Sequence, residues 1–508
     1  MPKWLENAVF YEIYPQSFND TNGDGIGDIQ GMIEKLDYIE SLGCNALWIN
    51  PVYDSPFMDA GYDVRDYKKI APRYGTNEDM VTFFQEAHAR GIKVLMDLVP
   101  GHTSDQHEWF LQSKKDEVNE YSGRYVWTSH AFEGIDGHPY ISGMTDRPAA
   151  YMLNFFASQP ALNYGWGVKC EKWQSATDSP EAIATKEALK DIMRFWLDQG
   201  CDGFRCDMAD SLVKNDDDDK HATARIWKEI RRMLDTEYPE VALVSEWCNP
   251  NSAINLGGFH MDFYLDHHHN GYNTLLRDYE CHEEDNSYFK KEGQGDIDRF
   301  LNDYLPKYAK TMHNGYISMF TCNHDTPRAS RTLSQGELKI AYAFIFTMPG
   351  VPFLYYGDEI GMKYLDLPSV EGGYHRTGSR TPMQWDDSKN YGFSTSDTIY
   401  ITQDKSEDAP TVQHQLGKKD SLLETTKDLI HLRKKYEDFK ANSSFEVLVH
   451  DKQTFVYRRG NLICAMNPSN HEVKVTVTCG NEALYEIGGA RKEGNEIVLP
   501  ASSFIVLK

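Results

Sequence analysis

The sequence predicts an α/β protein, a (β/α)8 TIM barrel with a subdomain inserted after strand 3 and a C-terminal antiparallel β domain. Between residues 9 and 360, amphipathic helix patterns alternate with short apolar runs, as is typical of parallel βα units. The alternation stops over residues 101–178, and beyond residue 436 alternating strand patterns replace it. We therefore expect a barrel (1–100 and 179–435), an inserted subdomain B (101–178) and a C-terminal β-sandwich (436–508).

Eight apolar runs supply the predicted barrel strands, and eight is the number that closes such a barrel. In one of the helices between them, which begins near Thr76, Met80, Phe84 and Ala87 fall on one face. A second helix begins at Ser179. The predicted strands span residues 10–14, 46–50, 92–98, 203–207, 241–246, 261–265, 316–320 and 352–356.

Charge and composition exclude several classes of partner. The formal net charge of −25 disfavours binding to nucleic acid or to an anionic membrane but leaves neutral sugars unaffected. No membrane span, secretory signal or organic cofactor is expected. The nine cysteines include no CxxC pair, which favours reduced thiols and a cytoplasmic location. We expect a monomer or a weak homo-oligomer.

Acidic residues follow several of the predicted strands, at the end of a parallel barrel where chemistry takes place. Asp207 and Glu246 close neighbouring strands, and a pair of carboxyl groups about 5 Å apart can cleave a glycosidic bond with retention of configuration. Arg205 lies on the same side of its strand as Asp207 and can hold that carboxylate ionised. This arrangement suits a nucleophile, with Glu246 as acid and base.

The chain resembles glycoside hydrolase family 13, the α-amylase superfamily, and within it the oligo-1,6-glucosidase and α-glucosidase branch. The resemblance covers nearly the whole chain. It is carried, in order, by DTNGDGIGD from Asp20, GYDVRDY from Gly61, DLVPGH from Asp97, QPALN from Gln159, GFRCDMAD from Gly203, SEW from Ser245, NHDTPR from Asn323, GVPFLYYGDEIGM from Gly350 and SRTPMQWD from Ser379.

This resemblance implies roles for individual residues. Asp207 would be the nucleophile, Glu246 the proton donor and Asp325 a third acid that binds sugar hydroxyls. Arg376 would close the sugar subsite against the non-reducing end. The residues implied to line that subsite are Asp63, His102, Arg205 and His324, together with Tyr67 or a neighbouring aromatic residue.

The same resemblance implies a structural metal. The loop after the first strand carries oxygen ligands at the spacing of a calcium loop, and calcium is expected there, with magnesium as the alternative. The ligands would be Asp20, Asn22, Asp24, Asp28 and the carbonyl of Ile26.

Three positions depart from the family pattern. Gly101 and Ala161 replace the Asn and Asp that help secreted α-amylases to bind a second calcium ion, so no such site is expected. Met208 stands where Val accompanies α-1,6 preference and where Ala or Thr accompanies α-1,4 preference, which leaves the linkage open.

The leading hypothesis is a retaining α-glucosidase that releases glucose from the non-reducing end of short α-1,4- or α-1,6-linked gluco-oligosaccharides. The first alternative is an endo-acting α-amylase or a transglycosylase or isomerase of the same family. The second is a non-catalytic binding relative, which would lack one of the three acids.

Overall fold

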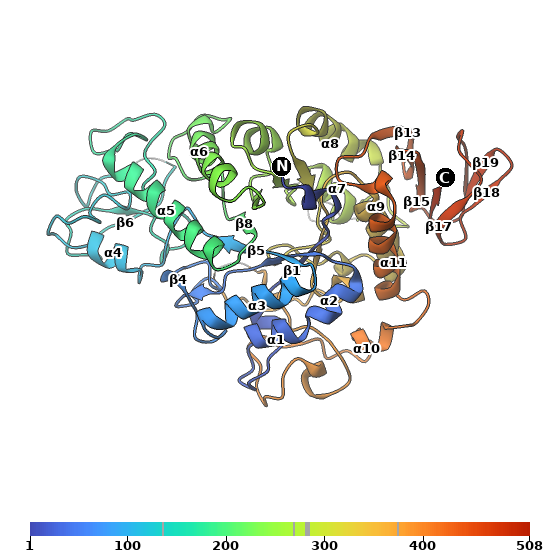
Figure 1. Ribbon diagram of the computed structural model, residues 1–508, viewed down its shortest axis with the longest axis horizontal. Helices are drawn as coiled ribbons and strands as arrows, with labels where there is room; N and C mark the ends of the chain where they lie inside the picture. Colours follow the sequence, from blue (N-terminus) through green and yellow to red (C-terminus); the bar gives the residue numbers. More distant parts are fainter. Residues whose placement is uncertain (135–136, 268–269, 280–284, 373–374) are drawn as a thin grey trace.

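The computed structural model, which describes residues 1–134, 137–267, 270–279, 285–372 and 375–508, contains the predicted parallel barrel (Figure 1). Its strands are paired in the order β11-β10-β9-β8-β5-β2-β1-β12. A parallel bridge between Phe320 and Phe353 joins the last strand to the first and completes the ring. The strands are β1 (Phe10–Ile13), β2 (Ala46–Ile49), β5 (Lys93–Leu98), β8 (Gly203–Cys206), β9 (Ala242–Ser245), β10 (Met261–Phe263), β11 (Tyr316–Ser318) and β12 (Phe353–Tyr355). All eight predicted strands are confirmed.

Helices cover the outside of the barrel. The helix predicted near Thr76 is α3, where the Thr76 side chain accepts a hydrogen bond from the Asp79 amide and Asp79 reciprocates in a capping box. The helix predicted at Ser179 is α5, capped by the Ser179 hydroxyl. The surrounding helices are α1 (Ile29–Glu34), α2 (Leu36–Leu42), α3 (Asn77–Ala89), α5 (Pro180–Asp198), α6 (His221–Glu237), α7 (Gly271–Leu276), α8 (Ile297–Thr311), α9 (Gln335–Thr347) and α11 (Leu422–Lys435).

The segment after β5 contains little regular structure. Its described parts, 101–134 and 137–178, contain one short helix and two short strands, α4 (Glu108–Ser113), β6 (Tyr140–Ile141) and β7 (Tyr151–Met152). Val126, Met152, Ala161 and Trp166 form a small buried core of its own. A bridge between His102 and Ala161 ties the segment to the carboxyl end of β5, so it stands beside the mouth of the barrel.

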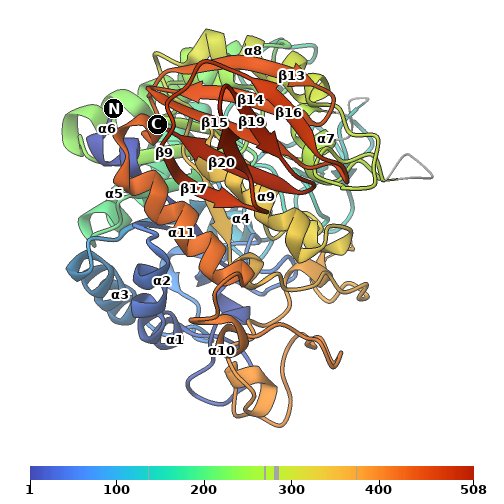
Figure 2. The same cartoon turned by 90° about the vertical axis from the view of Figure 1, so that its right-hand side faces the viewer.

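The C-terminal part forms two antiparallel sheets at the opposite end of the molecule from α4 and β6 (Figures 1 and 2). Apolar side chains of both sheets, among them Val456, Ile505 and Leu499, share one core. The first sheet has the order β13-β14-β15-β20-β17 and the second β16-β19-β18. Their strands are β13 (Phe445–Asp451), β14 (Thr454–Arg459), β15 (Leu462–Asn467), β16 (Val473–Thr476), β17 (Ala483–Ile487), β18 (Arg491–Glu493), β19 (Glu496–Leu499) and β20 (Ser503–Leu507).

Aromatic side chains fill the inside of the barrel. The rings of Phe10 and Phe353 stack with centroids 4.3 Å apart, and Phe263 packs edge-on against Phe353 at 4.8 Å. Trp48 contacts Phe263 in turn. These rings form an apolar floor, above which charges interact more strongly than they do in water. Separately, none of the described helices is long and apolar enough to cross a membrane.

Candidate active site

Asp207 and Glu246 share one guanidinium at the carboxyl ends of β8 and β9. Arg205 Nη1 donates to Asp207 Oδ1 at 2.9 Å, and Nη2 lies 2.8 Å from Glu246 Oε1. The Arg205 side chain is 1% exposed, against 10% for Asp207 and 18% for Glu246. Both acids therefore face the barrel mouth from fixed positions, held by the same guanidinium.

A buried carboxylate holds Arg205 from behind. Asp97, on β5, accepts a hydrogen bond from Arg205 Nη1 at 2.8 Å through Oδ1. Its Oδ2 accepts from Trp48 Nε1 at 3.0 Å and from the Tyr62 hydroxyl at 2.9 Å. Because Asp97 is fully buried and both its oxygens are occupied, it orients Arg205 without facing the cavity itself.

The turn after β8 links the two acids, because Met208 follows Asp207 in the chain and donates its backbone amide to Glu246. Met208 has a positive φ of 42°, which is uncommon outside glycine, and its amide donates to Glu246 Oε2 at 2.8 Å. Burial and the charge of Glu246 raise the pKa of Asp207 well above its usual range, while Arg205 opposes the shift. Asp207 therefore loses its proton at a higher pH than a free carboxyl group does, and only its ionised form can act as a nucleophile.

Asp325 lies across the cavity among three cationic groups. Its Oδ1 is 2.7 Å from Arg376 Nη1 and 2.9 Å from Arg380 Nη2, and its Oδ2 is 3.1 Å from His324 Nε2. Although burial raises it, these charges, His324 first, hold the pKa of Asp325 well below its usual range. Asp325 is therefore ionised and can accept hydrogen bonds from sugar hydroxyls.

His324 is clamped on both ring nitrogens. Nδ1 lies 3.0 Å from the buried carboxylate of Glu12, and Nε2 contacts the Tyr62 hydroxyl at 2.8 Å as well as Asp325. Although burial lowers it, Asp325 and Glu12 raise the pKa of His324 to about 9. The ring is consequently a cation at neutral pH, stacked on Tyr62 with centroids 5.3 Å apart.

The acids line an inner cavity of about 270 Å³. At one side, Arg376 Nη2 pairs with Asp59 while Nη1 holds Asp325, so a single guanidinium spans two carboxylates. Gln159 donates to the other oxygen of Asp59 at 2.8 Å. The lining residues are Asp59, Tyr62, His102, Phe155, Asp207, Met208, Asp210, Glu246, Trp247, Leu265, His267, Asp325 and Arg376.

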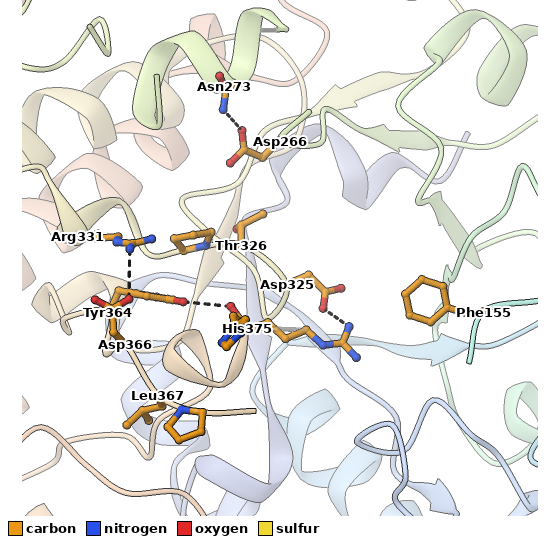
Figure 3. Close-up of a pocket in the computed structure, with 13 residues that line it drawn as sticks. Phe155, Asp266, Asn273, Asp325, Thr326, Arg331, Tyr364, Asp366, Leu367 and His375 are labelled. Atoms are coloured by element: carbon orange, nitrogen blue, oxygen red, sulfur yellow. Dashed lines mark hydrogen bonds and ion pairs between the residues drawn. The ribbon is translucent and has the colours of Figure 1, made fainter. Parts of the chain in front are cut away.

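A wider outer cavity of about 1030 Å³ adjoins the inner one and shares Phe155, Asp325 and Arg376 with it. Figure 3 shows Asp325 and Phe155 facing each other across its inner part. Its outer wall carries polar groups that already pair among themselves, Asp266 with Asn273 at 2.9 Å and Arg331 with Asp366 at 3.2 Å. The two cavities together can hold a chain of several sugar rings.

Two of the predicted sugar-binding residues lie elsewhere. The Asp63 carboxylate accepts backbone hydrogen bonds from Met58 at 2.8 Å and Asp59 at 3.0 Å, so it shapes its own loop and is fully buried. The Tyr67 hydroxyl donates to the carbonyls of Val99 and His102 behind the cavity wall. Neither residue lines the cavity, and both predictions are corrected on that ground.

Their places are taken by Asp59 and Tyr62, which line the cavity. Tyr62 is the neighbouring aromatic residue that the prediction left open. Sequence reasoning also missed Arg380, although it stands in the quoted SRTPMQWD motif. The signal that could have identified Asp59 is its position just before the GYDVRDY motif, four residues from an equivalent acid.

The remaining predicted residues, His102, Arg205, His324 and Arg376, all lie at the site. His102 lines the inner cavity, where its Nε2 contacts the Tyr62 carbonyl and its Nδ1 the Asn154 amide, each at 3.1 Å. Asn154 is held in turn by the buried Lys214 ammonium, which donates to its Oδ1 at 2.9 Å. Burial lowers the pKa of His102 to about 3, so this ring is neutral. His102 and His324 therefore differ in charge at neutral pH.

The loop after β1 holds the residues predicted to bind calcium. Asp20 accepts hydrogen bonds from the amides of Gly23 and Gly25 at 2.8 Å each, and Asp28 caps α1 through the Gly31 amide at 2.7 Å. The Asn22 amide and the Ser394 hydroxyl also donate to Asp20, so each of its oxygens already accepts two hydrogen bonds. Across the described ranges, no three His, Cys, Asp or Glu side chains gather as a metal cluster. An ion here would therefore need non-acidic oxygens as well. The candidate ligands are Asp20, Asn22, Asp24, Asp28 and the carbonyl of Ile26.

Comparison with known proteins gives the family. Residues 12–442 match the family described as alpha amylase, catalytic domain. The chain belongs to the α-amylase family. The oligo-1,6-glucosidase of Heyndrickxia coagulans is 32% identical over 93% of each chain, and the family makes this protein a glycoside hydrolase.

Two further similarities are to enzymes named as synthases. The trehalose synthase/amylase TreS of Mycolicibacterium smegmatis is 32% identical over 90% of this chain and 80% of that protein. An isomaltulose synthase mutant of Erwinia rhapontici NX5, solved in complex with D-glucose, has a TM-score of 0.83 at 27% identity, covering 100% of this hydrolase and 99% of that chain.

Proposed function

We propose that the protein is an exo-acting retaining α-glucosidase that releases glucose from the non-reducing end of short α-1,4- or α-1,6-linked gluco-oligosaccharides. The observation that carries this proposal is the ion pair between Arg376 and Asp59 beside the acids. A chain cut internally needs open space on both sides of the cleaved bond. The Arg376 bridge from Asp59 to Asp325 leaves the small inner cavity without that space on one side.

The proposed mechanism uses the two acids in sequence. Asp207 attacks the anomeric carbon while Glu246 gives its proton to the leaving glycosidic oxygen, which forms a glycosyl-enzyme ester. Glu246 then removes a proton from water, and that water displaces Asp207 and releases glucose with retained configuration. Asp325 accepts hydrogen bonds from the hydroxyls of the bound ring and strengthens them as positive charge develops on the sugar.

The outer cavity favours an oligosaccharide substrate. With about 1030 Å³ next to the inner cavity, it has room for the leaving part of a chain longer than a disaccharide. An isomerase has to retain its released sugar beside the glycosyl-enzyme, and a wide outer cavity lets that sugar escape more easily. This makes hydrolysis the first choice and isomerisation the second. The gathering of all three acids around one cavity disfavours a binding protein.

Three accessory features belong to the proposal: a metal ion, a location and a quaternary structure. A structural calcium ion, or magnesium in its place, would be held by the Asp20–Asp28 loop and would stabilise the fold without entering the reaction. We also place the protein in the cytoplasm, because its nine cysteines include no CxxC pair. A monomer or weak homo-oligomer remains our expectation for the quaternary structure.

Early products from maltotriose, isomaltose, sucrose and trehalose test the function. Glucose released first from maltotriose or isomaltose, with no product from Asp207→Asn, supports the proposal. Longer or rearranged saccharides would favour a transferase or isomerase instead.

Azide separates the roles of the two acids: it should give α-glucosyl azide with Glu246→Ala and β-glucosyl azide with Asp207→Gly, because only Asp207 forms the ester. An exchange of these two products would overturn the assigned roles.

A further inference from the structure

Glu371 is a buried carboxylate in the loop that follows β12, and the proposed mechanism does not use it. It is 1% exposed. Its Oε2 accepts from the Tyr14 hydroxyl at 2.7 Å and from Arg380 Nη1 at 2.9 Å, and its Oε1 accepts from Gln16. Tyr14 and Gln16 follow β1, so Glu371 fastens a distant loop to the barrel.

Arg380 connects this carboxylate to the active site. Its guanidinium is fully buried, and its three nitrogens point in three directions. Nη1 faces Glu371, Nη2 lies 2.9 Å from Asp325 Oδ1, and Nε donates to the His324 carbonyl at 2.8 Å. Arg380 therefore lies between Asp325, which lines the cavity, and Glu371, which does not.

The charges around Asp325 explain why a second carboxylate is needed. Both Arg376 and Arg380 reach Asp325 Oδ1, at 2.7 and 2.9 Å, so two guanidinium cations meet at one oxygen. Like charges this close repel, and a buried cation without a counter-charge is unstable. Asp59 balances Arg376 on the substrate side, and Glu371 balances Arg380 on the buried side.

The backbone next to Glu371 also touches the site. Gly372 has a φ of +78°, and a Cβ there would lie 2.9 Å from the Phe156 ring and 3.4 Å from Asp59 Oδ1. The loop that carries Glu371 thus passes directly beside Asp59. The position of this loop therefore affects both the Arg376–Asp59 pair and the Arg380–Glu371 pair.

We propose that Glu371 is a positioning residue, which pairs with the buried side of Arg380 and thereby holds that guanidinium on Asp325. Its role in the reaction rests on the proposed function, because it acts through the binding of glucose by Asp325. The contact that it maintains is a property of the fold and can be tested separately.

The kinetic test compares Glu371→Gln with Glu359→Gln. Glu359 is a matched control, because it is equally buried and accepts hydrogen bonds from the tyrosine hydroxyls of Tyr11 and Tyr38, away from the acids. We expect Glu371→Gln to lower kcat/KM about tenfold or more, chiefly in kcat, and Glu359→Gln to change it less than about twofold. Equal effects of the two variants would refute the positioning role.

The Glu371→Asp variant distinguishes a role of the negative charge of Glu371 from a role of its size, because aspartate keeps the charge on a shorter side chain. If the charge holds Arg380, Asp restores part of the activity lost with Gln, whereas a role in filling space predicts that Asp is the worse of the two. In a double-mutant cycle with Arg380→Lys, the losses should be far from additive. Additive losses would count against the proposal.

Crystal structures of Glu371→Gln and Glu359→Gln test the contact between Arg380 and Asp325 without any measurement of activity. We expect Arg380 to leave hydrogen-bonding distance of Asp325 in the first variant and to keep it in the second. If the contact survives in Glu371→Gln, the inference is wrong even where the wild type hydrolyses glucosides. If the wild type hydrolyses none of the saccharides, the proposed function fails, and the crystal comparison still decides the role of Glu371.

Discussion

Replacing Arg376 with methionine removes the guanidinium that joins Asp59 to Asp325 and keeps an unbranched chain in place of the aliphatic stem. Burial raises the pKa of Asp59, and Arg376 is the main charge that opposes this shift. Without it, the pKa of Asp59 would rise further and the inner end of the cavity would lose its charged donor. One charge-assisted hydrogen bond to the terminal sugar contributes about 1.5–3 kcal/mol. The expected loss in kcat/KM is therefore roughly 10- to 150-fold.

The assay is kcat/KM on maltotriose and isomaltose, together with chromatography of the first products. Arg331→Met is the matched control, because Arg331 lines only the outer cavity and pairs at 3.2 Å with Asp366, whose side chain is 81% exposed. Exposed pairs of this kind contribute little, so we expect a change below about threefold. If Arg376→Met behaves like Arg331→Met and still releases only glucose, the Asp59–Arg376 pair does not determine the exo pattern.

Three further predictions concern pH, metal and linkage. Since the reaction needs ionised Asp207 and the pKa of that group is raised, activity should fall with decreasing pH well above pH 4; an acid limb of kcat/KM at or below pH 4 would contradict this. If the Asp20–Asp28 loop holds calcium, EDTA should lower the Tm of the wild type by a few degrees, and added calcium should restore it better than magnesium. The Asp24→Ala variant should show no change of Tm with EDTA. A wild-type Tm insensitive to EDTA would exclude the ion. Met208 lines the inner cavity, so Met208→Val should raise the isomaltose-to-maltose ratio of kcat/KM by about tenfold, whereas an unchanged ratio would show that linkage is selected elsewhere.

The barrel and the positions of its acids could be predicted from sequence because both follow from local patterns. Burial of a strand produces a run of apolar residues, and the residue that closes the run lies at the same end of the barrel for every strand. Asp207, Glu246 and Asp325 were found in this way together with the family motifs, and the structure gathers them around one cavity. Arg205 follows from the two-residue period of β8.

The substrate loop could not be predicted in this way. Asp59 and Asp63 are four residues apart and chemically identical, and nothing in their spacing indicates which one faces the cavity. The backbone decides it, since Phe57 and Ala60 adopt positive φ values of 59° and 54° that turn the loop so that Asp63 faces its own amides. Tyr62, rather than Tyr67, follows Asp59 into the site for the same reason.

By itself the sequence determined the order of strands and helices, the three catalytic candidates and the family, because each is encoded in residues close together in the chain. Only the tertiary structure decided that Arg376 bridges Asp59 and Asp325, and that Arg380 lies between Asp325 and Glu371. The pairs with Asp325 and Asp59 join loops 51 to 317 residues apart in the chain, whereas Arg380 and Glu371 are nine residues apart within one loop region. Their geometry depends on how the loops pack over the barrel, and their strength depends on the burial that this packing creates.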